Sequence, residues 1–141
     1  MRATTNPRSD MQSWADPNAT PDLHLVCDQP MRWLTTNGRA HWAKDDPVRR
    51  YWRDMGVTLT RQALKGRTFE RVQVVFTIHR ADKRSFDPGN FLTSKHFLDG
   101  MVDAGMVPDD NFRHVVGPDH RYGEPGKRRF EVRVYDLGGA S

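Results

Sequence analysis

The chain has 141 residues, of which 36% are hydrophobic and 28% charged, so we expect one globular domain with a modest core. Cys27 is the only cysteine, which excludes a disulfide framework and a cysteine-rich zinc site and favours a reducing, cytoplasmic setting. The net charge of +4 and the pI of about 9.6 favour a polyanionic partner such as nucleic acid. No apolar run reaches the roughly 20 residues of a membrane span, and the first residues lack the apolar stretch of a secretory signal.

The first third of the sequence predicts an arm, a strand, a polar loop and a helix. Residues 1–21 are rich in Thr, Asn, Ser, Pro and Asp, which is typical of a flexible N-terminal arm. Residues 22–28 alternate and predict a short strand with Leu23, Leu25 and Cys27 on one face. A loop with aromatic, basic and amide side chains follows at residues 33–42. A helix is then predicted from residue 45 or 46 to residue 64, with Pro47 in its first turn and Trp52 on its apolar face.

The remaining residues predict a second helix and three more strands. Residues 69–80 alternate most clearly, with the apolar residues inward and Arg71, Gln73 and Thr77 outward. A helix is predicted over residues 91–104, a short strand near 114–116, a Gly/Pro-rich turn over 117–126 and a last strand over 129–137. The expected domain therefore covers residues 22–137, with residues 138–141 as a C-terminal tail. This order predicts an α+β fold in which the helices pack on one face of a small mixed sheet.

Acidic residues gather between residues 87 and 119, whereas basic residues are spread along the chain. Lys95, Asp99 and Asp103 are four residues apart and therefore share one edge of the second helix. Carboxylates from separate segments can hold Mg²⁺, which supports phosphodiester hydrolysis by neutralising the phosphate and activating a water. A nearby lysine can stabilise the charge that develops on the phosphoryl oxygens. We therefore consider Lys95 together with the flanking carboxylates of residues 87, 109 and 110 as a candidate site.

The same residues also have a structural interpretation. Asp87, Pro88, Gly89 and Asn90 are typical of a type II turn that leads into a helix cap. The charges along the helix edge are also compatible with an ordinary solvated face, and residues 108–111 with a polar loop. The two histidines at positions 114 and 120 form no recognisable zinc arrangement, so we expect structural roles for both.

The sequence R-S-F-D-P-G-N-F-L-T-S-K-H-F-L-D-G at residues 84–100, followed by A-G-M-V-P-D-D at 104–110, resembles the signature of the RusA family. That signature has a basic residue, Asp-x-Asp-Asn, a lysine, Asp-Gly or Asp-Ala on a helix, a glycine, and an acidic pair before a valine strand. N-G-R-A-H-W at residues 37–42 and Y-W at 51–52 are similar to the family's N-terminal Asn/Arg/Trp segment. The resemblance covers roughly residues 22–137.

The resemblance implies a RusA-like homodimeric endodeoxyribonuclease that nicks branched DNA such as Holliday junctions with Mg²⁺, or with Mn²⁺ as an alternative ion. Such enzymes serve DNA recombination and repair. By position, it implies that Asp87, Lys95 and Asp110 are catalytic and that Asp87, Asp109 and Asp110 bind the metal. Residue type and the resemblance together predict the DNA contacts, which are Asn37, Arg39, His41, Trp42, Arg84 and Asn90. Tryptophan in a small domain is also commonly a core residue, and we expect Trp52 to be one.

Two departures from the family pattern leave alternatives open. Gly89 replaces the second aspartate, so that carboxylate either comes from Asp99, Asp103 or Asp119, or is missing from a catalytically weakened or inactive protein that binds junctions without cleaving them. The lysine also lies two residues further from Asn90 than in the best-known members. Alignment on Asn90 would put Thr93 at the position of the family lysine. A threonine hydroxyl cannot replace an ammonium at a phosphate, so we prefer Lys95. A third hypothesis is a basic domain that mediates protein contacts, with its acids as caps and turns.

Overall fold

The computed structural model describes residues 19–34, 42–81 and 91–138, and at 42–45 it describes the backbone alone. Within these residues the elements are β1 (Leu23–Asp28), α1 (Trp42–Leu64), β2 (Val72–His79), α2 (Thr93–Asp103), β3 (Val115–Tyr122) and β4 (Arg129–Asp136). Their order and the α+β class are those predicted from the sequence. Neither of these helices combines the length and the apolar character that a membrane span requires.

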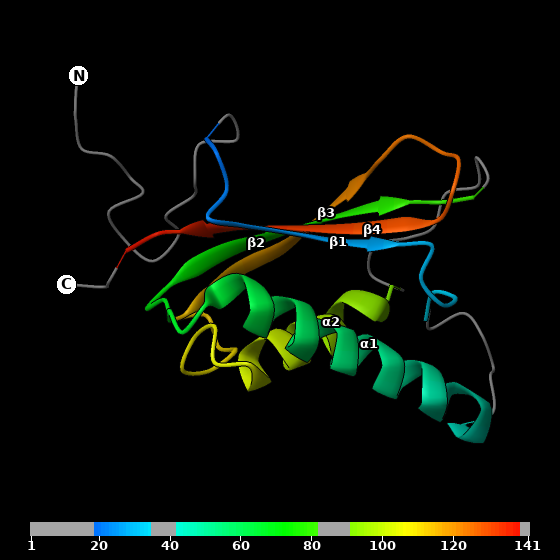
Figure 1. Cartoon of the computed structure of the whole chain (residues 1–141), viewed down its shortest axis with the longest axis horizontal. Coiled ribbons are helices and arrows are strands. Elements are labelled where there is room, and N and C mark those ends of the chain that lie inside the picture. The colour runs from blue at the N-terminus through cyan, green and yellow to red at the C-terminus, as the bar shows by residue number, and fades with distance from the viewer. Residues whose placement is uncertain (1–18, 35–41, 82–90, 139–141) are drawn as a thin grey trace.

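The strands form one mixed sheet in the order β1-β4-β2-β3. Strand β4 is antiparallel to both β1 and β2, whereas β2 and β3 are parallel. Both helices lie on the same face of this sheet (Figure 1). The apolar residues of the alternating strands, such as Leu25, Phe76 and Val132, are buried in the core beneath the helices. The predicted single layer of helices on a small sheet is therefore confirmed.

An aromatic cluster joins α1 to the sheet. Trp52 is 0% exposed, so its predicted place in the core is confirmed. Its ring stacks on Trp33 at 5.6 Å between centroids and meets the edge of Phe130 at 5.3 Å. Its indole N–H donates to the carbonyl oxygen of Arg32 at 3.0 Å, which satisfies the only polar group of the side chain. The cluster fixes the segment after β1 against the helix layer.

The two helices cross at a pair of glycines, Gly56 in α1 and Gly100 in α2. A Cβ added at Gly100 would overlap the carbonyl oxygen of Arg53 and lie 3.0 Å from the Cα of Gly56. The two backbones therefore touch directly, at a separation that no larger residue permits. Beside this crossing, the Arg53 guanidinium donates to Asp103 at 2.7 Å and joins the two helices.

Two predicted boundaries and the predicted exposure of two side chains differ from the structure. Helix α1 begins at Trp42, so Pro47 lies inside the helix rather than in its first turn, and its ring removes one backbone hydrogen bond there. Strand β3 continues to Tyr122 through residues 117–118, which were expected to begin a turn, because it pairs along its length with β2. Arg71 and Gln73 lie on the strand face away from the helices as predicted, yet both are buried.

Candidate functional site

The start of α2 is fixed by hydrogen bonds to the segment that follows β1. The backbone N–H of Leu92 donates to the carbonyl oxygen of Leu34 at 2.8 Å, and the N–H of Leu34 donates to the Thr93 hydroxyl at 2.8 Å. Leu34 is the last described residue before residues 35–41, and Phe91 is the first after residues 82–90. One end of each segment that carries expected DNA contacts therefore adjoins the start of α2, at Leu34 for residues 35–41 and at Phe91 for residues 82–90.

Most of the predicted site lies outside the described residues. This holds for Asp87 and Gly89, for the side chain of Trp42, and for the remaining predicted DNA contacts, which are Asn37, Arg39, His41, Arg84 and Asn90. The described members of the predicted site are Lys95, Asp109 and Asp110. The structure therefore bears on the predicted catalytic centre only through the positions of these three residues.

Lys95 lies in the first turn of α2 and is exposed. Its neighbour Ser94 is buried and hydrogen-bonds to the imidazole of His120 on β3, with 2.7 Å between Oγ and Nε2. The His120 ring packs against Phe76 and Phe91, at 5.7 and 6.0 Å between centroids. Burial lowers the pKa of His120, against a smaller opposing effect of the Asp119 charge. The structural role expected for this histidine is thus to attach the first turn of α2, and with it Lys95, to the sheet.

The lowered pKa of His120 gives the protein a pH-dependent stability. The unfolded chain binds a proton at His120 below the ordinary histidine pKa of 6.5, whereas the folded chain resists it, so stability falls as the pH drops through that value. Burial also lowers the pKa of His96, which acts in the same direction. We expect His120→Gln to lose less stability than the wild type between pH 7.5 and pH 5.5, with urea unfolding at both values as the measurement. An equal loss in both proteins would contradict this role of His120.

Asp109 and Asp110 lie in the exposed loop after α2, and their carboxylates differ in their partners. The Asp109 carboxylate accepts the backbone N–H of Asp110 at 2.7 Å and the side-chain amide of Asn111 at 3.4 Å. Within the described ranges, the Asp110 carboxylate has no recorded hydrogen bond or ion pair. Asp109 therefore shapes the loop, whereas the Asp110 side chain is exposed to solvent.

Lys95 and the acidic pair lie at opposite ends of α2. A helix advances about 1.5 Å per residue, so residues 95–103 alone span roughly 12 Å, and the acidic pair follows still further along the chain. The parallel pairing of β2 and β3 shows where each group lies along the sheet. Val115, which follows the acidic pair, lies opposite Val72 at the start of β2. His120, which bonds to the first turn of α2, lies opposite Phe76, further along β2. Within one chain, the described structure does not bring the lysine next to the acidic pair.

The acids considered as substitutes for the missing carboxylate are mostly engaged elsewhere. Asp103 pairs with Arg53, and Asp119 accepts from Gln73 at 3.3 Å and lies 3.6 Å from Arg121. In the part of the chain that the structure describes, no three His, Cys, Asp or Glu side chains are arranged to hold a metal ion. The acidic pair has the oxygen ligands that Mg²⁺ prefers, but a complete site would need a carboxylate from elsewhere.

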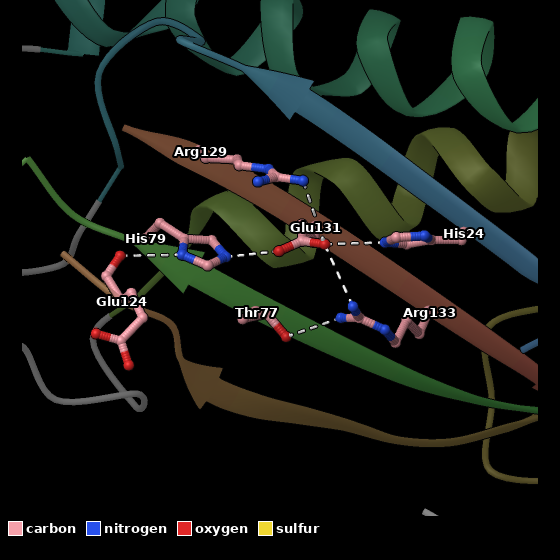
Figure 2. Close-up of polar contacts among 7 residues, drawn as sticks. All are labelled: His24, Thr77, His79, Glu124, Arg129, Glu131 and Arg133. Carbon is pink, nitrogen blue, oxygen red and sulfur yellow. Dashed lines mark hydrogen bonds and ion pairs between the residues drawn. The ribbon is translucent and has the colours of Figure 1, made fainter. Parts of the chain in front are cut away.

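A second polar cluster, which the sequence analysis missed, lies on the face of the sheet opposite the helices. Its centre is Glu131 of β4, which is 6% exposed (Figure 2). One carboxylate oxygen lies 2.9 Å from His24 Nε2 and the other 2.6 Å from His79 Nε2. The guanidinium groups of Arg133 and Arg129 lie 3.3 and 3.7 Å away. We call these five residues the Glu131 cluster.

The electrostatics of the Glu131 cluster keep its carboxylate ionised. Burial by itself raises the pKa of Glu131, but the hydrogen bonds from His24 and His79 and the charges of Arg129 and Arg133 together lower it. The His79 ring also has its Nδ1 at 3.0 Å from the carbonyl oxygen of Glu124. Both nitrogens of that ring therefore face oxygen atoms, one of the Glu131 carboxylate and one of the Glu124 backbone.

The sequence did contain a signal for this cluster. The alternation that places Phe130 and Val132 on the core face of β4 places Glu131 on the other face, and the same holds for His24 in β1. Finding the cluster also requires the register, in which Glu131 lies opposite both Thr77 and Val26. Those pairings join strands that are far apart in the sequence.

Comparison of the chain with models of known protein families and with curated protein sequences gave no match.

Proposed function

We propose that this chain is a Mg²⁺-dependent endonuclease that nicks branched DNA such as Holliday junctions and acts as a homodimer. The proposal draws on the resemblance of residues 84–110 to the RusA signature and on the basic character of the chain. The structural observation that supports it most is the pair of hydrogen bonds between Leu34 and residues 92–93. They hold Leu34, which precedes residues 35–41, next to residues 92–93, which follow residues 82–90, at the start of the helix that carries Lys95.

In this proposal the residues divide into two groups. Lys95 binds a phosphate oxygen and stabilises the charge that develops on it, and the segments 35–41 and 82–90 supply the DNA contacts. Asp87, Asp109 and Asp110 hold Mg²⁺, which supplies a water with a lowered pKa when bound. Asp87 comes shortly before α2 in the chain and Lys95 lies in its first turn, whereas Asp109 and Asp110 follow its other end, so a centre that uses all four residues draws them from the two copies of the homodimer.

A second candidate function is the binding of DNA junctions without cleavage. The separation of Lys95 from the acidic pair favours it, and so does Gly89 at the position of the second family aspartate. Both candidates require a surface that prefers branched to linear DNA. They differ only in whether a phosphodiester bond is broken.

One experiment separates the two candidates. A labelled four-way junction and a linear duplex of the same length are incubated with the protein, with and without Mg²⁺, and resolved on native and denaturing gels. The endonuclease predicts nicked strands from the junction only when Mg²⁺ is present. A retained native complex without nicks supports the binding protein, and equal affinity for junction and duplex contradicts both candidates.

The role of Asp110 is tested by Asp110→Asn, which keeps the shape of the side chain and removes its charge. We expect nicking to slow at least tenfold, equivalent to about 1.4 kcal/mol, while junction binding is retained. Asp54→Asn is the matched control, because Asp54 is an exposed residue in the middle of α1. Equal nicking rates for the two variants would remove Asp110 from the proposed site.

A further inference from the structure

We propose that the connection between β3 and β4, residues 123–128, is a preformed loop that binds the phosphate backbone of DNA. The inference deepens the proposed function, because it names a second part of the DNA-binding surface. It concerns binding alone and does not require cleavage.

The loop is fixed to the end of β2 by its backbone. The N–H of Gly123 donates to the carbonyl oxygen of Ile78 at 2.9 Å, and the N–H of Gly126 donates to that of Arg80 at 2.9 Å. Between them, the carbonyl oxygen of Glu124 accepts from the His79 ring at 3.0 Å (Figure 2). A Cβ at Gly123 would overlap that ring, so the loop packs directly on it. The Glu131 cluster thus holds the loop through His79.

The other side of the loop is fixed to the end of β1. The carbonyl oxygen of Arg128 accepts the N–H of Gln29 at 2.9 Å, and the Arg128 guanidinium donates to the carbonyl oxygen of Pro30 at 2.8 Å. Bonds to two strands hold the loop in one shape. A loop that is ordered before binding loses little conformational entropy when it meets a ligand.

Positive charge predominates around this loop. Lys127 and Arg121 are exposed, and Arg129 is partly exposed at the start of β4. The nearby acids are Glu124 and Asp28, which are exposed, Asp119, which is partly exposed and lies 3.6 Å from the Arg121 guanidinium, and Glu131, which is buried among its four basic partners. Because the Glu131 carboxylate is withdrawn from the surface, the solvent-facing groups favour a polyanion such as the phosphate backbone of DNA.

The loop and the start of α2 lie at the same end of the sheet. Phe130, at the start of β4, has its ring 6.3 Å from that of Phe91, which precedes α2. Phe130 also pairs with Ile78, the residue whose carbonyl holds Gly123. In Figure 1 the β3–β4 connection and the start of α2 both lie toward the right of the view, away from the end of α1. A DNA backbone that contacts Lys95 can therefore continue toward Lys127.

The test compares two double variants that remove the same charge from opposite ends of the molecule. Arg121→Gln with Lys127→Gln changes the proposed surface, and Arg61→Gln with Lys65→Gln changes exposed groups at the end of α1. The affinity of each protein for a labelled four-way junction is measured by fluorescence anisotropy across a range of NaCl concentrations. We expect the first double variant to reduce the slope of log K against log salt by about 1.8, roughly 0.9 for each lost phosphate contact, and the second to leave it unchanged.

The possible results test the phosphate-binding loop independently of the proposed nuclease activity. Equal slopes for the two double variants would overturn the phosphate-binding loop even if the wild type nicks junctions. A wild type that binds but does not nick would contradict the nuclease, while a reduced slope in the first variant would still support the loop. A wild type with no measurable affinity for DNA would overturn the loop directly. All four substituted side chains are exposed, and circular dichroism checks that each variant is folded.

Discussion

Replacing Gly100 by alanine is expected to lower the free energy of unfolding by about 4 kcal/mol or more, enough to unfold a domain of ordinary stability. The added Cβ would overlap the carbonyl oxygen of Arg53 and lie 2.8 Å from the backbone nitrogen of Val57. Both are backbone atoms of α1, so no side chain can move aside to relieve the overlap. Relief requires the two helices to separate, which would open the core around the aromatic cluster.

The measurement is urea unfolding followed by circular dichroism, with Asp99→Ala as the control. Asp99 is the preceding residue of α2 and is only partly buried, so alanine there adds no backbone overlap. We expect the control to unfold within about 1 kcal/mol of the wild type. A Gly100→Ala protein as stable as the control would show that the helices do not cross in contact.

The Glu131→Gln variant is expected to lose about 3 kcal/mol at neutral pH. Glutamine has nearly the same size, so the change removes charge rather than volume. The remaining basic groups of the cluster would face a neutral amide, and the amide nitrogen would replace one of the two acceptor oxygens. Glu70→Gln is the matched control, because Glu70 is 57% exposed and its recorded ion pair, with His114, is long at 3.9 Å.

The pH dependence gives this prediction a second test. The folded-state pKa of Glu131 is lowered, so its ionised form stabilises the fold above the ordinary glutamate pKa of 4.5, and this contribution is lost as the pH falls below it. The difference between wild type and Glu131→Gln should therefore be full at pH 7 and shrink in the acid range. A difference that stays constant from pH 7 to pH 3 would mean that packing, and not the charge, accounts for the loss.

The sequence predicted the fold well where alternation and helical spacing agree with burial. Leu23, Leu25 and Cys27 face the core as the alternation required, and Trp52 occupies the predicted apolar stripe. The prediction failed at β3, because Gly117 and Pro118 are typical of turns. The parallel pairing with β2 carries the strand through both residues, with a shift of register between Gln73 and Val75. A long-range pairing of this kind overrides local turn chemistry.

The candidate site was harder to predict, because its geometry depends on strand direction. Spacing correctly placed Lys95 on α2 and the acidic pair beyond it, but alternation says nothing about whether β2 and β3 are parallel. Because β2 and β3 are parallel, α2 between them runs back from the end of β2 toward the start of β3. Lys95 and the acidic pair therefore lie at opposite ends of α2. The Glu131 cluster was missed for a related reason, since it depends on the register between β1, β2 and β4.

The most direct test of the proposed function is a time course of strand cleavage on a labelled four-way junction by the wild-type protein, first with Mg²⁺ and then with excess EDTA. We predict nicks near the branch point that accumulate with Mg²⁺ and stop when the ion is removed. Folded protein that leaves every strand intact with both Mg²⁺ and Mn²⁺ would contradict the nuclease.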